Sequence, residues 1–339
     1  MSLEFRHIAH AYGEVTALKD VSFAAQAGEI TCLLGASGCG KSTLLGLAAG
    51  LLRLQHGSIV LDGAPVAEPN YNPPPEARPI GMVFQDGALF PHMTLEKNVA
   101  FGLPKARANE ALNWLERVGL AGLSERYPHE LSGGQQQRAA LARAMAPEPQ
   151  VLLLDEPFAS VDIVLRRRLR RDCRMLLRER ATITVLVTHD PEEALDIADR
   201  IAVMDAGRVI QFGTPSDLHA NPATPAIGAM FGNAEIIPAT RYGDLLQSAL
   251  GTFPVSCMRA PVPDAERLEL LLAIDQLDLV PDPAGLLARD HHVIGAITRV
   301  VLEPREGSAV TVETDAPVSS GQRYRLVPRP ASIRAFASA

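Results

Sequence analysis

The chain has 339 residues, of which 47% are hydrophobic and 21% charged, and its formal net charge is -7. This length allows two domains with a sizeable core, and the acidic balance argues against a general nucleic-acid binder. The four cysteines lack metal-ligand or CxxC spacing, which indicates a reduced cytosolic chain. We find no signal-peptide pattern and no run near the ~20 apolar residues that span a bilayer, so any membrane crossing is expected from another chain.

Short apolar runs separated by turn residues predict strands in the first quarter of the chain. These runs lie at residues 3–8, 21–23, 30–34, 57–63 and 80–84. The proline-rich stretch 69–79 before the last of them is not expected to be helical, because proline removes a backbone donor and clashes with the preceding turn.

A glycine-rich stretch lies between the apolar run 30–34 and a second apolar run that is expected to start a helix. Its residues are Gly35, Ala36, Ser37, Gly38, Cys39, Gly40, Lys41, Ser42 and Thr43, which fit the phosphate-loop pattern. In a strand–loop–helix context, backbone N–H groups and the positive end of the helix dipole bind phosphate. Lys41 is then expected to reach the β- and γ-phosphates and Ser42 to ligate Mg²⁺. The alternative is a glycine-rich turn that matches by chance, and the loop alone fits a kinase, a GTPase or many ATPases.

The middle of the chain alternates helices and strands. Helices are predicted at 96–101, 110–118 and 135–145, as a helical insertion over about 88–148. After it come a strand at 151–154, a long helix at 164–180, a strand at 182–187, a helix at 191–198 and a strand at 201–204. This alternation predicts an α/β layered domain with a largely parallel sheet. The long helix carries eight arginines, which could suggest nucleic acid or anionic lipid, but leucines at helical spacing favour a core-facing stripe with a solvated charged back.

Two acidic residues, Asp155 and Glu156, end the continuous apolar run 151–154. If that strand end lies near the phosphate loop, Asp155 can act with Ser42 at Mg²⁺. Glu156 can then polarise the attacking water as a carboxylate base. An acidic surface turn is the simpler explanation for such a pair when no phosphate loop is present.

A second anion site is predicted where Ser132, Gly133 and Gly134 open a helix, because a hydroxyl and free N–H groups meet there. With Leu131 and Gln135, these residues match the signature motif of ATP-binding-cassette (ABC) ATPases, and the chain resembles that family. An accidental helix cap would not explain the whole ordered set of motifs. The resemblance implies a P-loop NTPase core in which two copies pack head to tail, so that each ATP lies between the phosphate loop of one copy and Ser132 of the other.

The same resemblance assigns further residues. Tyr12 stands where the family stacks an aromatic ring on adenine, although an ordinary turn tyrosine is the alternative. Gln85 stands at the position used for Mg²⁺, for water and for sensing the membrane partner. His189 matches the switch histidine at the γ-phosphate, where a structural histidine is the alternative. The family's D-loop commonly reads Ser-Ala-Leu-Asp or similar, and Ser160-Val161-Asp162 stands in its place here. Asp162 is retained, whereas Val161 departs from the family pattern.

The single motif set and the lack of a fused membrane region disfavour twin-cassette proteins and most exporters. The segments 84–103 and 207–215 are similar to bacterial importer ATPases for ferric iron, polyamines, sulfate, thiamine or sugars, with ferric iron or thiamine favoured. The family then implies an ATPase domain over 1–235, a C-terminal regulatory β-barrel-like (OB/TOBE-like) domain over 236–339, and a homodimer bound to membrane permease subunits. A solute-binding protein would act indirectly, and the chain would lie on the inner face of the plasma membrane. The rival hypothesis is an ATP-driven clamp on nucleic acid or protein.

Overall fold

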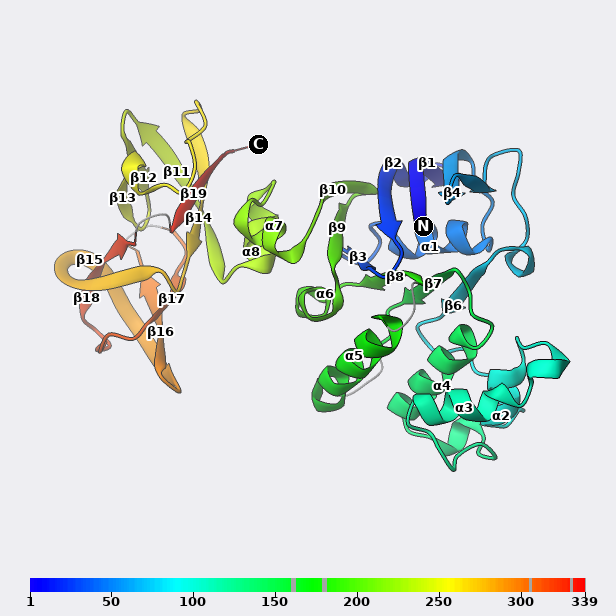
Figure 1. Ribbon diagram of the computed structural model, residues 1–339. Coiled ribbons are helices and arrows are strands. Elements are labelled where there is room, and N and C mark those ends of the chain that lie inside the picture. The colour runs from blue at the N-terminus through cyan, green and yellow to red at the C-terminus, as the bar shows by residue number, and fades with distance from the viewer. Residues whose placement is uncertain (160–162, 179–181, 305–306, 330–331, 339) are drawn as a thin grey trace. The chain divides into compact units, whose positions relative to one another are not determined.

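Figure 1 shows the computed structural model of the chain, which describes residues 1–159, 163–178, 182–304, 307–329 and 332–338. The contacts between residues divide the chain into two compact units, Met1–Pro215 and Ser216–Ala339. Among the described residues, no helix is both long enough and apolar enough to span a bilayer.

A six-stranded sheet in the order β10-β9-β3-β8-β7-β6 forms the centre of the first unit. Its parallel strands are β3 (Ile30–Leu34), β6 (Ile80–Val83), β7 (Val151–Asp155), β8 (Ile183–Thr188) and β9 (Arg200–Asp205). Only β10 (Arg208–Gly213) runs antiparallel to its neighbour. Every residue of β3 and β8 is buried, as expected for strands covered on both faces. The predicted largely parallel sheet is confirmed.

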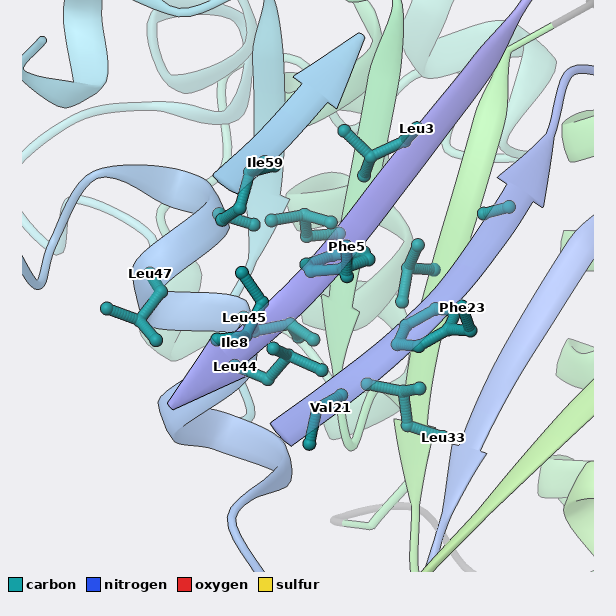
Figure 2. Close-up of a cluster of buried hydrophobic side chains, with 14 of the residues drawn as sticks. Leu3, Phe5, Ile8, Val21, Phe23, Leu33, Leu44, Leu45, Leu47 and Ile59 are labelled. Atoms are coloured by element: carbon teal, nitrogen blue, oxygen red, sulfur yellow. The ribbon is translucent and has the colours of Figure 1, made fainter. Parts of the chain in front are cut away.

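A second sheet, in the order β2-β1-β4-β5, packs against this centre and is antiparallel. Its strands are β1 (Ser2–Tyr12), β2 (Val15–Gln26), β4 (His56–Leu61) and β5 (Ala64–Ala67). Figure 2 shows its apolar face meeting Leu33 of the central sheet and the leucines of helix α1 (Lys41–Ala49). Phe5 stacks on Phe23 with 4.6 Å between ring centroids, which anchors β1 to β2 in this core.

The remaining helices of the first unit agree with the predicted positions to within three residues. They are α2 (Leu95–Ala100), α3 (Glu110–Arg117), α4 (Gly133–Met145), α5 (Ile163–Arg178) and α6 (Pro191–Ile197). Short 3₁₀ turns occur at Pro75–Ala77, Lys105–Arg107 and Pro128–Glu130. The expectation that 69–79 holds no helix was wrong for Pro75–Ala77, because proline is well tolerated at the first position of a helical turn.

The second unit contains helices α7 (Pro215–Ala220) and α8 (Pro225–Phe231) and two antiparallel sheets. One sheet has the order β13-β12-β11-β14-β19 and the other β17-β16-β15-β18. The strands are β11 (Ala234–Tyr242), β12 (Leu245–Ser248), β13 (Gly251–Pro254), β14 (Arg267–Ala273), β15 (Leu277–Ile294), β16 (Ile297–Glu303), β17 (Val310–Thr314), β18 (Arg323–Pro328) and β19 (Ile333–Ala337). A 3₁₀ turn follows β13 at Val255–Cys257.

Both sheets of the second unit contribute to a single hydrophobic core, with Leu270 and Phe253 from one and Val300 and Val312 from the other. This arrangement of two sheets around one core confirms the predicted small β-barrel-like fold. Strands β15 and β16 form a hairpin, and Gly295 in the turn between them adopts a φ of 64°.

Candidate functional site

The parallel strands bring four predicted segments to one edge of the central sheet. The phosphate loop follows β3, Gln85 lies two residues after β6, Asp155 ends β7, and His189 follows β8 directly. Because carboxyl ends of parallel strands meet at the same edge, residues far apart in the sequence gather there.

The phosphate loop wraps tightly between β3 and α1. Gly40, at φ 104°, is the N-cap of α1, and a Cβ on Gly35 would lie 2.3 Å from the carbonyl oxygen of Met204. The Lys41 side chain is buried, and its Nζ donates to the carbonyls of Gly35 (2.7 Å) and Ala36 (2.9 Å). The middle of the loop, residues 36–38, is exposed at the N-terminus of a nine-residue helix, which suits an anion.

Ser42 and Asp155 meet across the sheet edge, although β8 lies between β3 and β7. The Ser42 hydroxyl donates to Asp155 Oδ1 over 3.2 Å. Burial raises the pKa of Asp155, while the hydrogen bond from Ser42 opposes this shift. Among the described residues, no group of three His, Cys, Asp or Glu side chains is placed to hold a metal. A hydroxyl and a carboxylate fit Mg²⁺, which takes few protein ligands and shares the rest with phosphate and water.

Glu156 and His189 form a second pair at this edge. Glu156 Oε1 lies 3.2 Å from His189 Nδ1, and the Glu156 N–H donates to the carbonyl of Val187 (3.1 Å). The Glu156 backbone has a φ of 44°, a left-handed conformation that is costly for a side chain other than glycine. That turn directs Glu156 differently from Asp155. The His189 side chain is 56% exposed, so it can contact a ligand at the edge.

Tyr12 ends β1 with half of its surface exposed, and its hydroxyl lies 3.4 Å from Thr43 Oγ1. Two neighbours that we did not predict support it. Buried His10 meets the Tyr12 ring edge-on, and the Gln55 amide exchanges two hydrogen bonds with the Ala11 backbone. Since neither residue belongs to a sequence motif, only the strand register could reveal them.

Ser132 caps α4 and forms a capping box with Gln135, in which each side chain accepts from the other residue's backbone N–H. The hydrogen bonds of Ser132 and Gln135 in the described chain are local, and α4 lies among α2 and α3, apart from α1 (Figure 1). The signature residues and the phosphate loop are therefore separate in one chain. Asp162, also assigned to the site, lies outside the described residues.

Gln85 is exposed in the turn after β6. The loop that follows it is tied to α4 by Arg143, which donates to the carbonyls of Ala88 (2.7 Å) and Gly87 (3.0 Å). Arg143 also lies over the Phe90 ring, 5.3 Å from its centroid. This link was not predicted, because backbone acceptors leave no sequence signal.

The arginine-rich helix α5 differs in part from its predicted role. Leu169 and Leu177 are buried, as the core-facing stripe requires. Arg170, however, was placed on the solvated back and is buried with three acidic partners, one at the N-cap of α6 and two on α6 itself. The Asp-Pro-Glu-Glu sequence at 190–193, typical of a helix N-terminus, was the available signal for those acids.

Comparison with known proteins tests the family. Residues 18–159 match the sequence profile of the ABC transporter family. The sulfate/thiosulfate import ATP-binding protein CysA 2 of Chromobacterium violaceum is 41% identical over 337 residues, covering 96% of this chain and 90% of that protein.

The chain belongs to the ABC transporter family, among its importer ATPases.

Other relatives support the same assignment of this ABC ATPase. The Fe(3+) ions import ATP-binding protein FbpC of Mesorhizobium japonicum is 44% identical over 257 residues, covering 75% of this chain and 71% of that protein. The solved structure of cbiO1 from Clostridium perfringens, part of an ABC transporter complex, is 31% identical with a TM-score of 0.58 over 66% of this chain and 92% of cbiO1. An ATP-binding cassette solved as a dimer with ADP and Pi is 28% identical, with a TM-score of 0.54 over 62% of this chain and 98% of that one. As a member of this family, the chain binds ATP, and hydrolysis of that ATP is coupled to import.

Proposed function

We propose that this ABC ATPase drives uptake of sulfate or thiosulfate through separate membrane permease subunits. This choice of solute rests on how much of the chain aligns with relatives named for each solute. Relatives named for sulfate/thiosulfate import align with 96% and 99% of the chain, and so include the second unit. Ferric iron, favoured with thiamine in the sequence analysis, is the second candidate, because relatives named for Fe(3+) import are 41–44% identical over 75–84% of the chain.

At the site, Lys41 and the N–H groups of the phosphate loop bind the β- and γ-phosphates, and Tyr12 stacks on adenine. Ser42 and Asp155 would hold Mg²⁺, together with Gln85 at the end of β6. The ion would supply positive charge against the charge that develops on the phosphates.

Glu156 accepts a proton from the attacking water, and His189 contacts the γ-phosphate beside it. The 3.2 Å separation of these two side chains supports their acting together.

Two copies pair head to tail, and the Ser132–Gln135 cap of one copy completes the site of the other. The separation of this cap from the phosphate loop within one chain supports the pairing, as does the dimeric ADP-bound relative. We assign Asp162 to the same shared site, and the loop after Gln85 contacts the permease. The chain works from the cytoplasm, peripherally on the inner face of the bacterial plasma membrane.

We assign the ATPase domain to 1–235, with its helical subdomain at about 88–148, and a regulatory domain to 236–339. The β-rich part of the chain begins with β11 at Ala234, two residues before the proposed boundary. The contacts between residues group α8 with the second unit.

The test is uptake in the native cell. Cells that lack the gene should lose uptake of ³⁵S-sulfate and ³⁵S-thiosulfate but keep uptake of ⁵⁵Fe(3+), and the wild-type gene should restore them. Complementation with Glu156→Gln should fail, and that variant should accumulate as an ATP-bound dimer with little turnover. Loss of ⁵⁵Fe(3+) uptake alone would select the second candidate. If the tagged chain co-purifies with no integral membrane protein, the rival clamp hypothesis replaces transport.

A further inference from the structure

A single buried arginine joins α5 to the segment that carries His189. The Arg170 side chain is only 6% exposed, and its guanidinium contacts three carboxylates, from the N-cap of α6 and from α6 itself. Nη2 lies 2.8 Å from Asp190 Oδ2 and 3.4 Å from Glu193 Oε2, and Nη1 lies 3.2 Å from Asp196 Oδ2. These acids are spaced by three residues, so they follow one face of the helix start.

Asp190 is the partner that connects this cluster to the site. Its Oδ2 binds Arg170, while its Oδ1 caps α6 by accepting from the N–H groups of Glu192 (2.9 Å) and Glu193 (3.4 Å). The Asp190 N–H donates to Thr188 Oγ1 (3.1 Å). His189, which precedes Asp190 directly, is thus held between the end of β8 and a residue fixed by Arg170.

Without Arg170, burial of the acidic side chains in this cluster would lower the free energy of unfolding. Glu193 is buried, its Oε1 has no hydrogen-bond partner among the described residues, and burial raises the pKa of its carboxyl against the opposing effect of Arg170. A charged group is rarely buried in this way for stability alone, since apolar packing usually does as well. The arrangement therefore fixes the geometry of the start of α6.

We infer that Arg170 is a positioning residue for ATP hydrolysis: by holding Asp190, it sets the place of His189 against Glu156. The inference rests on the proposed roles of His189 and Glu156. Arg170 acts through Asp190 and His189 and does not contact ATP in this proposal. Two contacts carry the effect: Arg170 binds Asp190 at the start of α6, and His189, the residue before Asp190, lies 3.2 Å from Glu156.

The experiment compares ATPase kinetics and ATP affinity of the full-length chain. Arg170→Gln should lower kcat by about tenfold to a hundredfold, because small misplacements of a reacting group have effects of that size. The Kd for ATP should stay within about twofold, since Arg170 does not line the phosphate loop. Arg171→Gln, on the exposed side of the same helix, is the matched control and should leave kcat unchanged.

A double-mutant cycle with His189→Gln separates positioning from general damage. If Arg170 acts through His189, adding Arg170→Gln to His189→Gln should lower kcat no further. Losses that multiply, or an unchanged kcat in Arg170→Gln alone, would overturn the inference. If His189→Gln itself keeps full turnover, the proposed catalytic role fails instead, which is a distinguishable result.

Removing Arg170 alone leaves buried Glu193 without its cation, so the variant can fail to fold. The double variant Arg170→Gln/Glu193→Gln removes both charges, so it tests the positioning role in a chain that still folds. It should melt near the wild type and show the same fall in kcat with an unchanged Kd for ATP. A folded pair with wild-type kcat refutes the positioning role.

Discussion

Replacing Asp155 by asparagine should have opposite effects on stability without and with nucleotide. Because burial raises the pKa of Asp155 above the ordinary 3.8, the folded chain holds this proton more tightly than the unfolded chain does. The ionised carboxylate therefore lowers the free energy of unfolding, and this cost develops as the pH rises through the folded pKa. At neutral pH, Asp155→Asn without nucleotide should melt at or above the wild-type temperature.

With Mg²⁺ and ATP the order should reverse. A ligand at a hundred times its Kd stabilises the folded state by about 2.7 kcal/mol. The unit Met1–Pro215 is in the size range where 1 kcal/mol shifts Tm by about 2–4 °C. The wild type should therefore gain about 5–11 °C. Asp155→Asn keeps the neutral hydrogen bond to Ser42 but lacks the charge that holds Mg²⁺, so most of this gain should disappear.

Thermal unfolding followed by fluorescence measures both effects, in buffer alone, with ATP and EDTA, and with ATP and Mg²⁺. The variant should show the same Tm in the two ATP conditions, whereas the wild type should show a higher Tm with Mg²⁺. A full Mg²⁺-dependent shift in Asp155→Asn would remove Asp155 from the metal site. An unliganded wild type whose stability rises between pH 4 and pH 7 relative to the variant would contradict the effect of burial.

Substitutions at three further positions test the nucleotide loop, the adenine contact and the core. Gly35→Ala should abolish ATP binding in a titration, because its Cβ would lie 2.3 Å from the Met204 carbonyl oxygen. Tyr12→Ala should weaken ATP binding by the ~1–3 kcal/mol of one stacked base, whereas Tyr12→Phe should bind almost normally because the hydroxyl contact with Thr43 is long at 3.4 Å. Phe5→Ala should lower the free energy of unfolding of the first unit by about 3–5 kcal/mol in urea, since Phe5 is 1% exposed.

The features that were predictable from sequence are those set by local chemistry. The apolar runs of β3 and β7 could only be strands buried on both faces, and the loop at 35–43 has a sequence that few structures other than a phosphate loop require. The placement of Asp155 followed from the same logic, because it ends one of those strands. Its contact with Ser42 agrees with that expectation.

The features that were missed depend on tertiary context. The pattern of α5 shows which side carries leucines, but not that α6 would cover Arg170 and bury it. Arg143 binds backbone carbonyls, which every sequence offers equally. In each case the contacting group either lies far away in the sequence or is a backbone carbonyl, which no particular residue type reveals.

Strand order explains why His189, rather than Glu156, connects the parts of this site. Strand β8 lies between β3 and β7, so His189 leaves the sheet between the phosphate loop and the carboxylates of β7. Ser42 reaches Asp155 past β8 because it lies in the first turn of α1, beyond the strand ends. A shift of α6 would therefore move His189 relative to both neighbours while leaving Ser42 and Asp155 in place. This arrangement is the geometric basis of the positioning role proposed for Arg170, which acts on His189 and not on the Ser42–Asp155 pair.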